Sequence, residues 1–279
     1  MKFKGQVDIK DLSKLLIQKQ SQAGQDLFVI AMTQGKKNGT FLELGGYHPF
    51  EISNTYVLEK MFGWNGWSVD LVDNSLDLNI FEERIWNRFY QDVKDSMWPP
   101  VGTKFKDLPN YIQLELINVH NYKNYVEPFE NVDIGWNSVR PNTSFIQQDA
   151  VAVNYDSLPG HIDYLQIDID DAPKQMQLLK NLVENKTFSV ITFEHEFHQG
   201  TLEVIEQREN QRKILTDAGY ILVVSDIAHE DKNKSRQLHE LHIYEDWWAN
   251  PKTISLEIID KYLWIDNVQP KYWEKALFD

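Results

Sequence analysis

The segment from residue 40 to residue 74 constrains the fold more than any other part of the chain, because it has the pattern of one β-α-β unit. The apolar run at 41–44 predicts a short strand, and Gly45-Gly46 ends it. A helical apolar pattern follows, and after it comes a second apolar run that ends at Asp70. Two parallel strands need such a crossover, so the sequence predicts an α/β fold built on a parallel sheet.

The turn and the acid that closes the second strand indicate a nucleoside ligand. Glycine lets a ligand approach the backbone at Gly45-Gly46, and an acid placed like Asp70 accepts hydrogen bonds from ribose hydroxyls. The dinucleotide pattern G-x-G-x-x-G is missing, because the two glycines are adjacent and Tyr47-His48-Pro49 follows. We therefore expect a ligand with a ribose and no diphosphate, such as S-adenosylmethionine. A plain β-α-β unit with a tight turn is the alternative.

Several short motifs follow one another in a fixed order between about residue 21 and residue 195. They are SQAGQD at 21–26, SNTYVLEK at 53–60, RP at 140–141, QDA at 148–150 and IDYLQIDID at 162–170. Together they resemble the FkbM family of S-adenosylmethionine-dependent methyltransferases. Two positions depart from that family: Pro49 replaces the last glycine of its turn, and Asp171 replaces the glycine after its fourth strand.

The resemblance implies a Rossmann-like methyltransferase fold, in which a seven-stranded sheet is mostly parallel and its last strand is antiparallel. The polar link at 226–237 agrees with this, because a strand pair without a crossover helix is antiparallel. We expect an N-terminal helical lead at 1–39, a methyltransferase domain at 40–245 and a C-terminal extension at 246–279 packed on that domain. A central insertion at about 95–143 lies within the domain.

Composition limits the environment and the partners. No cysteine is present, which excludes disulfides and a cysteine nucleophile and is compatible with a reducing cytoplasm. The net charge of −14 argues against nonspecific nucleic-acid binding. No apolar run is long enough to span a membrane, and the N-terminus lacks a signal-peptide pattern. We expect a cytoplasmic protein whose partner is a small-molecule or glycan acceptor. The sequence is compatible with either a monomer or a homo-oligomer.

Acidic residues follow the predicted strands at their carboxyl ends, where open α/β sheets bind ligands. Asp70 suits the ribose, and Glu43 suits either the amino-acid end of the cofactor or the ordering of the turn. Asp149-Ala150 resembles the family segment that contacts the adenine. The predicted cofactor-binding residues are Glu43, Gly45, Gly46, His48, Ser53, Asn54, Asp70, Asp149, Ala150 and Asp168.

The catalytic candidates follow two strands that should be neighbours. They are His195, Asp170 and Glu194. His195 is the predicted general base, because a neutral imidazole can take a hydroxyl proton near neutral pH. The alternative is a Mg²⁺ ion held by Asp168, Asp170 and Glu194, since hard cations prefer oxygen ligands.

The leading hypothesis is an O-methyltransferase that acts on a hydroxyl of a sugar, glycan or related small molecule. A nucleotide-sugar or nicotinamide oxidoreductase could use the same β-α-β unit, although the missing diphosphate glycines disfavour it. The third hypothesis is a catalytically degenerate methyltransferase fold kept as a binding module, which the departures at Pro49 and Asp171 keep open.

Overall fold

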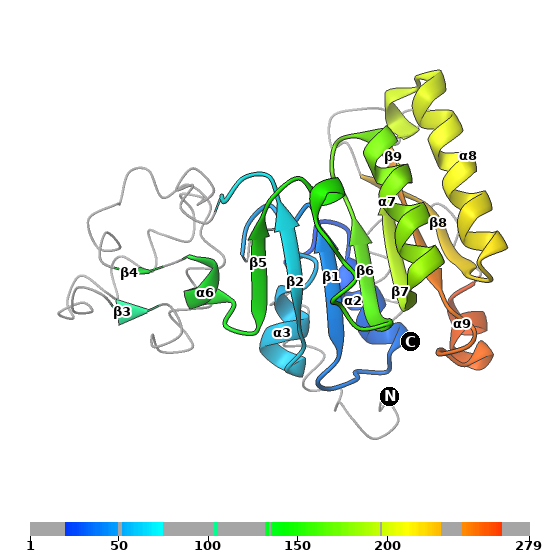
Figure 1. Ribbon diagram of the computed structural model, residues 1–279. Coiled ribbons are helices and arrows are strands. Elements are labelled where there is room, and N and C mark those ends of the chain that lie inside the picture. The colour runs from blue at the N-terminus through cyan, green and yellow to red at the C-terminus, as the bar shows by residue number, and fades with distance from the viewer. Residues whose placement is uncertain are drawn as a thin grey trace.

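The computed structural model describes residues 20–49, 52–74, 103–104, 132–133, 135–195, 197–229 and 242–263 (Figure 1). Most of the expected N-terminal lead, most of the expected insertion, Glu196 and the end of the expected C-terminal extension lie outside these ranges.

A seven-stranded sheet forms the centre of the molecule, with the strand order β5-β2-β1-β6-β7-β9-β8 (Figure 1). Its strands are β1 (Thr40–Leu44), β2 (Asn65–Asp70), β5 (Thr143–Gln147), β6 (His161–Ile167), β7 (Thr187–Glu194), β8 (Ile221–His229) and β9 (His242–Ala249). The pairs from β5 through to β7 are parallel, whereas β9 runs antiparallel to both β7 and β8. The prediction of a mostly parallel seven-stranded sheet with a reversed last strand is therefore confirmed. A separate pair joins β3 (Thr103–Lys104) and β4 (Val132–Asp133).

Helices cover both faces of this sheet (Figure 1). One face carries α2 (Gln25–Met32) and α3 (Tyr56–Phe62), and the other carries α7 (Ala172–Asn185) and α8 (Leu202–Asp217). The shorter elements are α6 (Trp136–Val139), η4 (Ala150–Ala152), η5 (Phe197–Gln199) and α9 (Leu256–Tyr262). None of the helices among the described residues has the length and apolar character that crossing a membrane requires.

The starts of α7 and α8 are set by capping side chains, and both lie near the carboxyl edge of the sheet. Asp171 accepts a hydrogen bond from the backbone N–H of Lys174 at 3.0 Å, and Thr201 accepts one from Val204 at 3.3 Å. Such caps satisfy N–H groups that have no partner within the helix. Asp171, where the resemblance expected glycine, therefore has a structural role.

The core lies mainly between the sheet and the α7–α8 layer. Its apolar residues include Leu42, Leu44, Ile167, Leu179, Phe193, Leu215 and Trp248. The other face packs α2 against β9, where the rings of Phe28 and Trp247 lie 4.9 Å apart. β9 continues to Ala249, past the expected boundary at residue 245, because it pairs with a strand on each side.

Candidate functional site

A pocket of about 470 Å³ opens at the carboxyl edge of the sheet, and we call it the carboxyl-edge pocket. This volume is in the range of small-molecule sites. Its walls come from the ends of β1, β2 and β6, the segment after β5 and the start of α7. It is lined by Gly45, Tyr47, Ile52, Asp70, Leu71, Val72, Asn74, Asp149, Ala150, Asp168, Ile169, Asp170, Asp171 and Lys174.

The glycine turn after β1 packs tightly between its neighbours. Gly45 has a φ of +86°, and a Cβ placed on it would lie 1.5 Å from the carbonyl oxygen of Asp168. A Cβ on Gly46 would lie 1.8 Å from the Oγ atom of Ser68. Only glycine fits both positions, because the ends of the neighbouring strands leave no room for a side chain. Gly45 also lines the pocket, so the turn contributes backbone to its wall.

Asp70 lies at the end of β2, and its carboxylate orders the backbone around the pocket. Oδ2 accepts from the N–H of Tyr47 at 2.8 Å, and Oδ1 accepts from the N–H of Val72 at 3.0 Å. A carboxylate oxygen has two lone pairs, so each oxygen of Asp70 can accept one more hydrogen bond. A diol such as that of a ribose would supply two such donors.

Asp149 and Lys174 face each other across the pocket wall. Asp149 caps η4 by accepting from Val151 at 3.2 Å, and its other oxygen lies 2.8 Å from the Nζ atom of Lys174. The hydrogen bond from Lys174 holds the pKa of Asp149 below its usual value, and the same bond raises the pKa of Lys174. Sequence reasoning missed Lys174. The sequence signal for Lys174 was its position in the first turn of the predicted helix that follows the strand at 162–168, which brings its side chain near the acids at the carboxyl edge.

Several predicted cofactor residues lie behind the turn instead of along the pocket. Glu43 is buried and accepts hydrogen bonds from the N–H of Asn54 at 3.1 Å and the hydroxyl of Thr55 at 2.9 Å. It therefore orders the residues that precede α3, which is neither the amino-acid end of a cofactor nor the glycine turn itself. Burial raises the pKa of Glu43. The charge of Arg140 and the groups that donate hydrogen bonds to Glu43 lower it, but burial is the larger effect. His48 and Ser53 are also buried, and neither lines the pocket.

Arg140 ties these residues together. Its side chain is fully buried; Nε lies 2.6 Å from Oε2 of Glu59, and one Nη donates to the Thr55 hydroxyl at 2.8 Å. The other Nη donates to the carbonyl of Pro49 and to the hydroxyl of Ser53, each at 3.1 Å. The motifs at 53–60 and 140–141 thus meet as one buried network that supports the turn. Pro49 belongs to this network through its carbonyl group.

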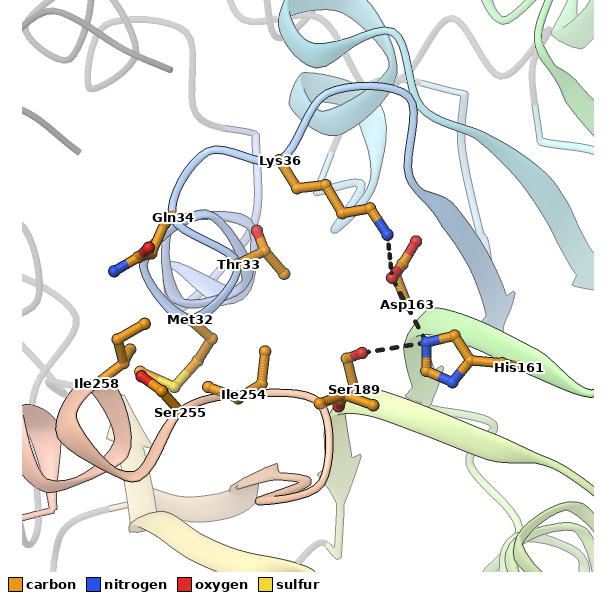
Figure 2. Close-up of a pocket in the computed structure, with 11 residues that line it drawn as sticks. Met32, Thr33, Gln34, Lys36, His161, Asp163, Ser189, Ile254, Ser255 and Ile258 are labelled. Carbon is orange, nitrogen blue, oxygen red and sulfur yellow. Dashed lines mark hydrogen bonds and ion pairs between the residues drawn. The ribbon is translucent and has the colours of Figure 1, made fainter. Parts of the chain in front are cut away.

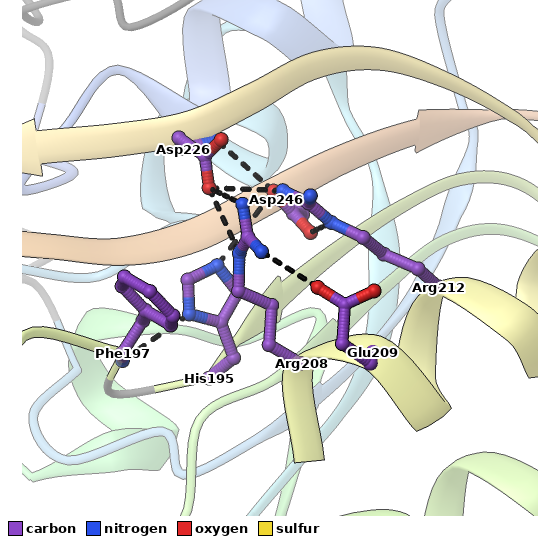
Figure 3. Close-up of polar contacts among 7 residues, drawn as sticks. All are labelled: His195, Phe197, Arg208, Glu209, Arg212, Asp226 and Asp246. Carbon is purple, nitrogen blue, oxygen red and sulfur yellow. Dashed lines mark hydrogen bonds and ion pairs between the residues drawn. The ribbon is translucent and has the colours of Figure 1, made fainter. Parts of the chain in front are cut away.

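His195, the predicted general base, lies away from the pocket. It is fully buried, and its Nδ1 atom accepts from the N–H of Phe197 at 3.3 Å. Its Nε2 atom is 3.6 Å from Asp246 (Figure 3). Glu194 does not line the pocket either, whereas Asp170 does. Of the three catalytic candidates, Asp170 is the one with access to a bound ligand.

The described residues do not form the predicted metal site. Among them, the one group of three or more acidic or histidine ligand atoms within 4.8 Å of one another is His195, Asp226 and Asp246. The predicted trio of Asp168, Asp170 and Glu194 does not converge in this way. Asp170 lies in the link between β6, which ends at Ile167, and α7, which begins at Ala172, so no strand pairing fixes it beside Glu194 at the end of β7.

In the group of His195, Asp226 and Asp246, both carboxylates are already paired with arginine side chains (Figure 3). The Nε atom of Arg212 lies 2.7 Å from Asp246, and an Nη atom of Arg212 lies 2.9 Å from Asp226. Arg208 also contacts Asp226, at 2.5 Å. Two guanidinium groups balance two carboxylates, so a metal ion would have to displace them. We name these four residues, together with His195, the α8 ion cluster.

A second hollow, of about 380 Å³, lies at the opposite edge of the sheet between α2 and α9 (Figure 2). Its polar groups pair with one another. His161 lies 3.3 Å from the hydroxyl of Ser189, and Lys36 lies 2.7 Å from Asp163. Open α/β sheets bind ligands at the carboxyl ends of their strands, so the carboxyl-edge pocket is the better candidate site.

A scan against models of known protein families finds no match, and a search of curated proteins finds none either. Some solved structures are similar in arrangement. A precorrin-6y C5,15-methyltransferase from Geobacter metallireducens has 12% identity and a TM-score of 0.41, covering 84% of this chain and 92% of its own. A SAM-dependent O-methyltransferase from Thermotoga maritima has 11% identity and a TM-score of 0.38, covering 88% and 71%. A SAM-dependent methyltransferase from Aquifex aeolicus has 15% identity and a TM-score of 0.33, covering 88% and 98%. Likenesses at these TM-scores say nothing about the reaction or the substrate of this chain.

Proposed function

We propose that this chain is a methyltransferase that takes its methyl group from S-adenosylmethionine and transfers it to a hydroxyl group of a sugar, glycan or related small molecule. The observation that carries the proposal is the carboxyl-edge pocket. It combines a glycine turn without side chains, a carboxylate at the end of β2 and an acidic segment after β5. The sequence motifs similar to the FkbM family support the same function.

The residues present fit this cofactor. Asp70 would accept the ribose hydroxyls, because each of its oxygens keeps a free lone pair beside its backbone bond. The Gly45 turn would lie against the amino-acid part, because Gly45 lines the pocket without a side chain. Asp149 and Ala150 would lie along the adenine, and Asp149 is fixed there by Lys174.

The acceptor chemistry requires positioning and the removal of one proton. When bound, S-adenosylmethionine supplies an electrophilic methyl group, whose bond to sulfur breaks as a bond to the acceptor oxygen forms. The acceptor hydroxyl loses its proton in this step. Asp170, the catalytic candidate that lines the pocket, is the residue to which we assign the acceptance of that proton. His195 has no such access, because it is fully buried. No residue set among those described calls for Mg²⁺ in this step.

Calorimetric titration with S-adenosylmethionine tests the cofactor. Wild-type protein should bind at micromolar concentration, and Asp70→Ala should abolish binding because the ribose loses both acceptors. Asp156→Ala is the matched control, since it removes an exposed carboxylate that does not line the pocket. Unchanged binding by Asp70→Ala would disprove the ribose assignment. No binding by the folded wild type at millimolar ligand would disprove the methyltransferase and favour a degenerate module. Binding of reduced nicotinamide cofactor would favour an oxidoreductase.

A further inference from the structure

A separate depression of about 330 Å³ lies between the amino-terminal ends of α7 and α8, and we call it the α7–α8 hollow. It shares Asp170 and Asp171 with the carboxyl-edge pocket, so the two spaces adjoin at these residues. A ligand in the α7–α8 hollow would therefore lie next to a ligand in the pocket.

The floor of the α7–α8 hollow contains an amide with an unmet hydrogen-bonding group. Gln207 is 4% exposed and lines the hollow, and its amide lies 2.6 Å from the amide of Gln175. The other polar atom of the Gln207 amide has no hydrogen-bond partner in the part of the chain that the structure describes. Leaving a buried polar group unpaired is costly. Because Gln207 also lines the hollow, a polar ligand group that reaches its amide from the hollow would satisfy this atom.

Gln175 fixes this floor to the ends of two strands. With its amide oriented to satisfy both atoms, its nitrogen donates to the carbonyl of Glu194 at 2.7 Å and its oxygen accepts from the N–H of Ile169 at 3.3 Å. Gln175 is itself almost completely buried. The amide pair of Gln175 and Gln207 is thus held in place relative to the carboxyl edge of the sheet.

The charge of the α7–α8 hollow selects among polar ligands. Asp170, Asp171 and Glu203 contribute carboxylates, and neither lysine nor arginine is found among its described lining residues. Asp171 is balanced by Lys174, whose Nζ atom lies 3.5 Å away, so Asp170 and Glu203 leave the lining negative. Carboxylates repel phosphate and carboxylate groups and leave those groups without a counter-charge. Thr201 adds a hydroxyl group to the lining. The lining therefore favours an uncharged ligand that can both donate and accept hydrogen bonds.

We propose that the α7–α8 hollow binds the uncharged, hydroxyl-bearing part of the methyl acceptor, and that Gln207 determines this specificity. The inference rests on the proposed methyltransferase function, and it adds a location and a charge rule for the acceptor. Hydroxyl groups suit the Gln207 amide whichever of its two atoms faces them, because a hydroxyl both donates and accepts. Acceptors whose recognised part carries phosphate or carboxylate are excluded by the same lining.

The test is a saturation-transfer NMR titration with a panel of neutral methyl glycosides of common hexoses and pentoses, compared with glucuronate and glucose 6-phosphate. Each probe is added to the protein with and without S-adenosylhomocysteine. We expect at least one neutral glycoside to bind, and neither anion. Gln207→Leu should weaken that binding roughly tenfold, the usual effect of losing one ligand hydrogen bond. Glu203→Lys, at the exposed rim, should allow glucuronate to bind.

Gln211→Leu is the matched control. Gln211 is one helical turn further along α8 and fully buried, and its amide atoms also lack hydrogen-bond partners among the described residues. It therefore shares the unpaired amide of Gln207 but does not line the α7–α8 hollow. The Gln211→Leu variant should bind the glycoside like the wild type, and all variants should bind S-adenosylhomocysteine equally. The proposal is overturned if no neutral glycoside binds, if the anions bind as well, or if Gln207→Leu binds like Gln211→Leu. If the wild type does not bind S-adenosylhomocysteine, that result counts against the proposed function instead. Glycoside binding measured in the absence of S-adenosylhomocysteine still tests the hollow in that case.

Discussion

Glu245 and Asp246 follow one another in β9, but the two faces of the sheet give them opposite surroundings. Both side chains are buried, at 2% and 0% exposure. Glu245 points to the α2 face, where it accepts a hydrogen bond from the Gln25 amide at 2.8 Å, and burial raises its pKa to about 8. Asp246 points to the α8 face. Burial alone would raise its pKa, but the hydrogen bonds from Arg212, with His195 3.6 Å away, outweigh burial and lower it.

The comparison teaches that burial alone does not decide the state of an acid. Successive side chains of a strand point to opposite faces, so adjacent acids meet different helices. A guanidinium group stabilises the charged form of Asp246, whereas a neutral amide cannot do this for Glu245. Among the described residues, Arg140 is a buried cation on the α2 and α3 face, but it pairs with Glu59 and opposes the burial that raises the pKa of Glu43 instead.

The largest expected effect comes from removing that cation. Arg140→Met should lower the free energy of unfolding by about 3–5 kcal/mol, because it leaves the buried carboxylate of Glu59 without its counter-charge. Urea denaturation measures the change. The free energy of unfolding of Arg140→Lys should lie between those of the wild type and Arg140→Met, since lysine keeps the charge but not the planar set of donors. A loss below about 1 kcal/mol for Arg140→Met would show that this face tolerates unpaired acids more generally.

Glu245→Gln should separate the two acids of β9 by their pH dependence. The folded pKa of Glu245 is raised from 4.5 to about 8, so the folded protein binds this proton more tightly. The contribution to stability is therefore complete below pH 4.5 and is lost as pH rises to about 8.

The variant should match the wild type in acid and be more stable by about 2–4 kcal/mol above that window. Urea unfolding measured across the pH range checks this. Asp246→Asn should give the opposite trend, because a lowered pKa stabilises the folded state only above the unfolded value. Equal pH slopes for the wild type and Glu245→Gln would contradict the difference between the faces.

Arg212→Met tests the α8 face and should have the smallest effect of the three. We expect a loss of about 1–3 kcal/mol in the free energy of unfolding, since the cation lost is partly exposed. Arg212 is 21% exposed, and Arg208 remains beside Asp226. Lys213→Ala is the control on the same helix. The pair of Lys213 with Asp217 is exposed, so its removal should leave the free energy of unfolding nearly unchanged. A larger loss for Arg212→Met than for Arg140→Met would reverse the ranking of the two faces.

The local features of the pocket could be predicted from the sequence. Gly45 lies in the turn, Asp70 closes β2, and Asp149 and Asp168 follow their strands, because strand ends are marked by local apolar runs. The direction of His195 could not be predicted. It follows β7 as expected, but its ring lies against Asp246, a residue that reaches it only through the antiparallel pairing of β9 with β7.

The sequence by itself determined the parallel β-α-β organisation, the reversed last strand and the acids along the carboxyl edge, because these depend on residue spacing over short segments. Only the tertiary structure decided which of those acids line the carboxyl-edge pocket, which are paired with arginine and which form part of a buried network. It also brought Gln207 to Gln175 and Lys174 to Asp149. Such contacts depend on how whole helices pack across the sheet, and one sequence does not record which side chains of distant elements come together.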